Sequence, residues 1–232
     1  MNVALLGLPR AGKTTVFKAL TGLAVPEISH GASSTGGRER HLGVIRVQDE
    51  RVDGLSAIFS PKKTTYSEIT LIDMPAVDHG EKGPAIDPEQ LGVLKTGDAF
   101  LHVVRAFANP SVAHPRGTSD PLRDVQLAES ELVSADYVVA AKRLERMAKE
   151  HLEGPERDVL EKCRAHLEQE EPLRLLELNE QEKAHIAGYS FASQKPMVIL
   201  ANIDEKDVRG EAYGDLAGYA RSRGMGFIGI CA

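Results

Sequence analysis

The N-terminal residues of the chain combine types and a spacing that can hold a polyphosphate. An apolar run leads into Gly-Leu-Pro-Arg-Ala-Gly-Lys-Thr at residues 7–14, which fits GxxxxGK(S/T) and opens a helical segment. In such a loop the backbone N–H groups surround phosphate oxygens, and the start of the helix adds partial positive charge. We expect Lys13 to act catalytically on the β and γ phosphates and Thr14 to bind Mg²⁺. A glycine-rich turn that binds nothing is the alternative. The nucleotide-binding residues expected here are Pro9, Arg10, Ala11, Gly12, Lys13, Thr14 and Thr15.

The run Ser67–Asp73 ends in a carboxylate, at the place where a buried strand presents an aspartate that holds Mg²⁺ through water. A regulatory switch would carry a glycine three residues later, and this position is Ala76. Alanine keeps the N–H but lacks the freedom of glycine, so we expect a switch that moves less or meets the γ-phosphate differently. An ordinary strand end is the alternative for Asp73. Thr14 and Asp73 are thus the predicted metal-binding residues.

The fifth apolar run ends in Asn202-Ile203-Asp204-Glu205, where GTPases place Asn-Lys-x-Asp. The Asn amide orients the base, and the Asp accepts hydrogen bonds from guanine donors that adenine lacks. Here Ile203 replaces the Lys and Glu205 replaces the Asp, so the guanine clamp is altered. A polar exit from strand to loop is the alternative. We expect Asn202, Ile203 and Glu205 to contact the base of ATP or GTP.

Short apolar runs of strand length recur along the chain, with helical patterns such as Thr14–Leu20 and Glu211–Arg223 between them. This alternation predicts an α/β fold with a mostly parallel, doubly wound sheet, a Rossmann-like P-loop NTPase. Only 5% of residues are aromatic, so aliphatic side chains must fill the core, as in buried parallel strands. The predicted strands are Val3–Leu6, Val44–Val47, Ile69–Ile72, Phe100–Val104, Met197–Ala201 and Phe227–Ile230.

The alternation is interrupted between residues 121 and 193, where only helical patterns occur. Val125, Leu132 and Val139 recur every seven residues, and a second stripe includes Leu160 and Cys163. We predict an inserted α-helical hairpin, resembling a coiled coil, in which the two stripes face each other. The charged runs 142–150 and 168–171 are then solvated faces, with a partner-binding surface as the alternative. The predicted domains are residues 1–120 with 194–232, which bind nucleotide, and the insertion 121–193.

Composition excludes several classes of protein. The formal net charge of -6 and the lack of a clear basic patch give no general attraction to nucleic acid. Cys163 and Cys231 lie far apart without the spacing of a zinc site, and we expect both to be buried. No apolar stretch reaches 18 residues, and the N-terminal run is too short for a signal peptide. We therefore expect a cytoplasmic protein with no membrane contact.

These motifs, together with Leu-His-Val-Val-Arg-Ala-Phe at residues 101–107 and the helical insertion, resemble the YchF family of Obg-like ATPases. The family has Asn-x-x-Glu where other GTPases have Asn-Lys-x-Asp, as at Asn202 and Glu205 here. The similarity extends over essentially the whole chain. It implies a nucleotide-binding domain with a helical hairpin, hydrolysis of ATP often in preference to GTP, and association with the ribosome or ribosomal RNA.

The resemblance also implies roles for individual residues. The family has a hydrophobic residue where Ras-like enzymes have a water-positioning Gln, and Val77 fits this pattern. A His beyond the His-Val-Val-Arg strand would then orient the attacking water, and His114 occupies that place, with a surface loop His as the alternative. Cys231 and Ala232 match the residues that open the loop packed on the base. The family continues into a closing helix and a TGS domain, so we expect a fragment of a longer protein, or else a short paralogue.

Three departures from the family weaken the case for hydrolysis. Its switch I Thr has only a misregistered counterpart in Thr35, the glycine-rich core of its switch II is absent from residues 80–88, and Ala76 replaces a glycine. A nucleotide-binding scaffold with little hydrolysis is therefore the alternative to an NTPase, and a small-molecule kinase is a more distant one. Turnover should be slow without a partner, because the sequence supplies no evident arginine finger or water-positioning Gln. Arg10, inside the phosphate loop, either lends charge or points to solvent. The preferred base and the oligomeric state stay open.

Overall fold

A computed structural model describes residues 1–22, 40–109, 111–207 and 213–232. Six strands form one sheet in the order β2-β3-β1-β4-β5-β6, parallel throughout except for the antiparallel pair β2 and β3. The predicted mostly parallel α/β fold is confirmed, and each predicted strand lies within an observed one. The strands are β1 (Asn2–Leu6), β2 (His41–Val47), β3 (Ser67–Asp73), β4 (Ala99–Ala106), β5 (Met197–Ile203) and β6 (Gly226–Ile230).

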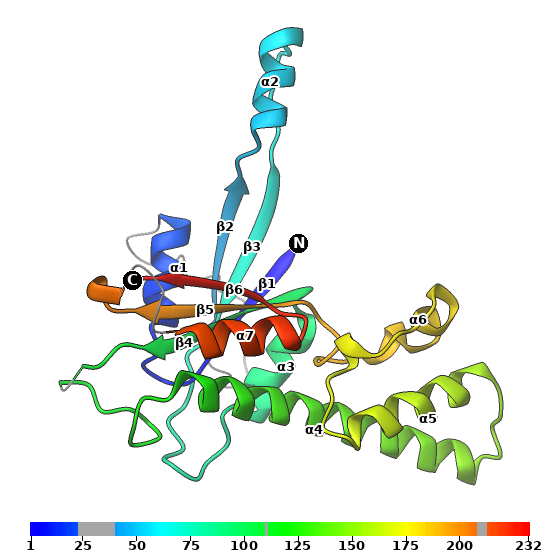
Figure 1. Ribbon diagram of the computed structural model, residues 1–232. Coiled ribbons are helices and arrows are strands. Elements are labelled where there is room, and N and C mark those ends of the chain that lie inside the picture. The colour runs from blue at the N-terminus through cyan, green and yellow to red at the C-terminus, as the bar shows by residue number, and fades with distance from the viewer. Residues whose placement is uncertain (23–39, 110, 208–212) are drawn as a thin grey trace.

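Helices cover both faces of the sheet, as Figure 1 shows. Successive residues of a strand point to opposite faces, so Val3 and Leu5 pack with Phe17 of α1, while Ala4 and Leu6 join the main core beneath α3, α4 and α7. The α-helices are α1 (Lys13–Thr21), α2 (Glu50–Phe59), α3 (Pro88–Thr96), α4 (Pro121–Lys149), α5 (Pro155–Leu167), α6 (Glu180–Ile186) and α7 (Gly214–Ser222). The 3-10 helices are η1 (Leu173–Leu175), η2 (Ala187–Tyr189) and η3 (Glu205–Asp207).

The parallel arrangement gathers the C-terminal ends of four strands at one edge of the sheet. β1 ends at Leu6, β3 at Asp73, β4 at Ala106 and β5 at Ile203. In open α/β sheets this edge is where ligands bind, because the connecting loops meet there. The loops that carry the predicted site residues therefore lie together, although they are far apart in sequence.

The insertion contains a helical hairpin, but its first helix does more than predicted. α4 has 29 residues, about 44 Å at 1.5 Å per residue, and runs from beneath the sheet out to α5 (Figure 1). Its N-terminal half, with Val125 and Leu132, packs in the main core. Its C-terminal half, with Val133 and Leu144, packs with α5 around Leu160. The prediction that the whole first stripe faces the second helix is therefore wrong, because a seven-residue period identifies a buried face and not its partner.

Two further features differ from or extend the sequence predictions. Cys163 is buried, but Cys231 is exposed, so the prediction for Cys231 is wrong. β2 and β3 continue into an arm with α2 at its tip (Figure 1), and no side chain of α2 is buried.

None of the helices that the structure describes is long and apolar enough to cross a bilayer. The division into domains at residues 121 and 193 stays a prediction.

The packing of α4 beneath the sheet predicts the result of a paired substitution. Leu132→Ala should lower the free energy of unfolding by about 2–5 kcal/mol, because Leu132 is fully buried in the main core. Val138→Ala on the same helix should change it by less than about 0.5 kcal/mol, because Val138 is exposed. Urea unfolding followed by circular dichroism measures both values. Equal effects would contradict the packing of α4 described above.

Candidate nucleotide-binding site

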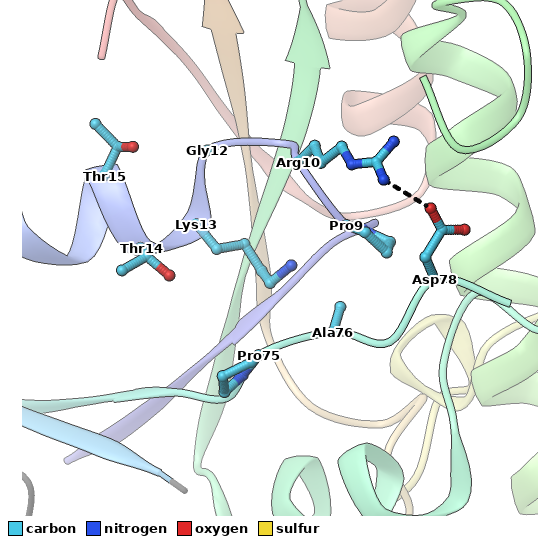
Figure 2. Close-up of a pocket in the computed structure, with 9 residues that line it drawn as sticks. All are labelled: Pro9, Arg10, Gly12, Lys13, Thr14, Thr15, Pro75, Ala76 and Asp78. Carbon is cyan, nitrogen blue, oxygen red and sulfur yellow. Dashed lines mark ion pairs between the residues drawn. The ribbon is translucent and has the colours of Figure 1, made fainter. Parts of the chain in front are cut away.

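A cavity of about 460 Å³ opens at the C-terminal edge of β1 and β3. Its size is within the range of pockets that hold small organic ligands. Figure 2 shows the phosphate loop, residues 7–14, and the start of α1 on one side, with Pro75 and Ala76 of the segment after β3 on the other. Of the residues predicted from the loop, only Ala11 is not in the lining, since it is buried against Val16 and Val103. The lining residues are Pro9, Arg10, Gly12, Lys13, Thr14, Thr15, Pro75, Ala76 and Asp78.

The path of the phosphate loop depends on two glycines. Gly7 and Gly12 have φ values of 143° and 100°, a region that residues with a Cβ rarely adopt. A Cβ on Gly7 would lie 2.2 Å from the carbonyl oxygen of Val103, and one on Gly12 would lie 2.3 Å from Nδ2 of Asn202. The loop can therefore pass this close to β4 and β5 only because neither residue has a side chain.

Lys13 places a buried positive charge at the cavity. Its Nζ donates hydrogen bonds to the carbonyl oxygens of Gly7 at 2.9 Å and Leu8 at 3.0 Å. Burial lowers the pKa of Lys13 to about 8, against the opposing effect of the Asp73 carboxylate. The ammonium is therefore poorly compensated where it lies, and a polyphosphate beside it would supply the missing negative charge.

Thr14 and Asp73 meet at the metal position predicted from the sequence. Oγ1 of Thr14 donates to Oδ2 of Asp73 at 2.8 Å, and Asp73 is fully buried. Its other oxygen, Oδ1, has no hydrogen-bond partner among the described residues. An unpaired buried carboxylate oxygen beside a hydroxyl fits a hard cation such as Mg²⁺, which prefers oxygen ligands and keeps several waters. These two residues could hold Mg²⁺, directly through Thr14 and through water at Asp73.

His41 is a neighbour of this pair that the sequence did not suggest. Because β2 pairs antiparallel with β3, His41 lies opposite Asp73, and its Nδ1 is 3.6 Å from Oδ2 of Asp73. His41 could have been identified from the sequence only by predicting the register between β2 and β3, which places it opposite Asp73. Thr35, the proposed counterpart of the switch I threonine, lies outside the described residues.

Asn202 joins the end of β5 to the phosphate loop. Its Nδ2 donates to the carbonyl oxygen of Ala11 at 3.1 Å, and its Oδ1 accepts from the backbone N–H of Ala232 at 3.2 Å. The predicted residues Cys231 and Ala232 are thereby held near the loop, and both are exposed. Glu205 is exposed at the start of η3. The Ile203 side chain, in contrast, lies in the main core, so the prediction that it contacts the base does not fit its burial.

Arg10 connects the phosphate loop to two other segments instead of pointing only to solvent. Its Nη2 lies 3.3 Å from Oδ2 of Asp78, the ion pair drawn in Figure 2, and its Nη1 donates to the carbonyl oxygen of Ala113 at 3.0 Å. Asp78 was not predicted from the sequence, where only its place five residues after Asp73 distinguishes it. Arg10 therefore links the two segments that follow β3 and β4.

His114 is buried, so its interpretation as a surface residue is wrong. Its Nδ1 accepts a hydrogen bond from the backbone N–H of Arg116 at 3.1 Å, and its Nε2 lies 3.0 Å from Oδ2 of Asp124. Burial lowers the pKa of His114, against the opposing effect of the Asp124 carboxylate. Because Nδ1 accepts, the proton lies on Nε2, toward Asp124. Both ring nitrogens thus face the protein, and His114 is not among the residues that line the cavity.

Comparisons with known proteins agree with this geometry. A family model described as "50S ribosome-binding GTPase" matches residues 2–203. The chain is 27% identical to the "Ribosome-binding ATPase YchF" of Bacillus subtilis (strain 168), over 100% of this chain and 65% of that protein. It is 30% identical to the protein of the same name from Escherichia coli O157:H7, over 98% of this chain and 64% of that protein.

A solved structure, the YchF GTPase of Schizosaccharomyces pombe, superposes with a TM-score of 0.79 at 25% identity. The match covers 100% of this chain and 65% of that one. The chain thus spans slightly less than two thirds of the length of these relatives.

The contacts of Asn202 predict a loss of nucleotide affinity on its removal. Asn202→Ala leaves the Ala11 carbonyl without its donor, and the loop loses its link to β5. The affinity for a nucleoside diphosphate, measured by calorimetry, should fall by about 1–3 kcal/mol, the typical cost of an unpaired buried polar group. Asn179→Ala is the matched control, because Asn179 caps α6 far along the chain from the site. An affinity unchanged in Asn202→Ala would exclude this role for the residue.

Proposed function

Because the chain belongs to the 50S ribosome-binding GTPase family, in its YchF branch, we propose that it binds and hydrolyses a nucleoside triphosphate in association with the ribosome. The observation that carries the proposal is the buried Lys13 ammonium at a glycine-bordered loop, beside the pair of Thr14 and Asp73. Positive charge, loop amides and a metal position meet there at one cavity. This is the combination that phosphoryl transfer requires.

The chain's own residues have separate tasks in this reaction. The backbone N–H groups of residues 10–14 cradle the α and β phosphates, and Lys13 moves from the loop carbonyls to the β and γ phosphates. Thr14 and Asp73 would hold Mg²⁺, which when bound would supply positive charge to neutralise the phosphate oxygens. Asn202 orients the base from the end of β5, and Glu205 stands beside it where a guanine clamp would have Asp. ATP or GTP is the substrate, and Glu205 in place of the guanine-reading Asp favours adenine.

The cavity has few side chains that could orient the attacking water. Val77, where Ras-like enzymes have Gln, cannot hold a water by hydrogen bonding. His114 would have to leave its contact with Asp124 and rotate toward the cavity before it could accept a proton. We therefore propose slow turnover by the chain alone. Turnover is faster with ribosomal subunits in the cytoplasm, because a partner stabilises the conformation in which His114 faces the cavity.

Phosphate release from Mg-ATP and Mg-GTP tests this function, with and without large ribosomal subunits. Lys13→Ala should reduce turnover by at least about 100-fold, the scale expected for loss of a charge at the transition state. Lys18→Ala is the matched control, since Lys18 is exposed on the same helix. The wild type should turn over faster with large subunits. If the chain binds nucleotide but Lys13→Ala and the wild type release phosphate at the same rate, the chain is a nucleotide-binding scaffold and the proposed hydrolysis is contradicted.

A further inference from the structure

The residues between β3 and α3, 74–87, form one wall of the cavity, and we call them the switch segment. Asp73, immediately before it, is held by Thr14, and Ala76 and Asp78 line the cavity. The segment ends at Asp87, whose carboxylate caps α3 by accepting from the N–H groups of Glu89 and Gln90. Its path therefore determines where the wall lies relative to a bound γ-phosphate.

Glu131 of α4 holds the backbone near the end of the switch segment. Its Oε1 accepts from the N–H of Ala85 and its Oε2 from the N–H of Ile86, both at 2.6 Å. A carboxylate that accepts from two backbone donors forms charge-assisted bonds, which are stronger than neutral ones. The side chains of Ala85 and Ile86 are buried in the main core, so this point of the segment is fixed by both bonding and packing.

The middle of the switch segment is attached by arginines from other loops. The guanidinium of Arg116 donates to the carbonyl oxygens of Glu81 and, at 2.6 Å, Gly83. Arg10 pairs with Asp78, and both side chains are more than a third exposed. Interactions between exposed groups are weak and screened. The pair of Arg10 and Asp78 can therefore change with nucleotide more easily than the attachment at Glu131.

The position of Glu131 on α4 relates the switch segment to the hairpin. The next residue, Leu132, packs in the main core, and the one after it, Val133, packs in the core of the hairpin. Glu131 thus lies where α4 leaves the body and continues toward α5 (Figure 1). Asp124, two helical turns earlier and on the same face, contacts His114. One helix therefore holds both the switch segment, through Glu131, and the segment that follows β4, through Asp124.

We propose that Glu131 is a positioning residue that fixes the switch segment to α4 and thereby couples nucleotide hydrolysis to the position of the helical hairpin. Glu131 is not among the residues that line the cavity, so it acts through Ala76 and Asp78. A partner that tilts the hairpin moves this attachment, and a nucleotide that moves the switch segment shifts the hairpin in return. The effect on turnover rests on the proposed hydrolysis, whereas the mechanical coupling requires only nucleotide binding.

Amide hydrogen exchange of the whole chain, with and without a non-hydrolysable Mg-nucleoside triphosphate, tests the coupling. In the wild type the nucleotide should change exchange in residues 8–14, in the switch segment and in residues 133–167 of the hairpin. In Glu131→Ala the change at residues 8–14 should persist, and that in the hairpin should be lost. Glu145→Ala, on an exposed position of α4, is the matched control and should behave as the wild type.

Steady-state kinetics provide the second readout. Glu131→Ala should lower kcat by about tenfold while nucleoside diphosphate affinity stays within about twofold, because the lost bonds position the wall and do not hold the nucleotide. Glu131→Gln, which keeps one acceptor oxygen, should lie between, and it replaces Glu131→Ala if that variant does not fold.

A hairpin that responds to nucleotide equally in Glu131→Ala and the wild type would overturn the proposal. So would a wild-type hairpin that does not respond while residues 8–14 do. If the wild type shows no turnover at all, the proposed hydrolysis fails, and the exchange result still decides the role of Glu131.

Discussion

The site depends on one buried positive charge, the Lys13 ammonium, which the protein keeps beside backbone carbonyls instead of in water. Burial lowers its pKa to about 8, so the protonated form is held at a cost that the Gly7 and Leu8 carbonyls and the Asp73 charge offset only in part. A polyphosphate would offset that cost further. The tight loop, the glycines that allow it and the strand ends behind it all position this charge at the cavity.

Much of the fold could be predicted from the sequence, because strand length and apolar content are local properties. The alternation of short apolar runs with helical patterns predicted the parallel sheet, and the phosphate loop was correctly placed between β1 and α1. The partner of the first stripe of α4 could not be predicted. Val125 and Leu132 have the same spacing as a hairpin seam, yet the sheet covers them, since a 29-residue helix is long enough to serve two cores.

The candidate site divides in the same way between local and distant contacts. Residues 9–14 and Asp73 follow from motifs in which neighbouring residues share one task. Glu131 gives no such signal, because its carboxylate meets Ala85 and Ile86 across 46 and 45 residues of chain, respectively. His114 shows the limit of transferring a role along a resemblance. Its position in sequence matched, but its burial and its contact with Asp124 depend on how the following loop returns to α4.

A calorimetric titration with a non-hydrolysable Mg-nucleoside triphosphate tests the central claim, that residues 7–14 hold a polyphosphate. We expect saturable heat with one nucleotide per wild-type chain. Gly12→Val should give no heat, because its Cβ would lie 2.3 Å from Nδ2 of Asn202 and its φ is unfavourable for a branched side chain. A wild-type chain that produces no heat with either ATP or GTP analogues, or a folded Gly12→Val chain that binds as the wild type does, would contradict the account.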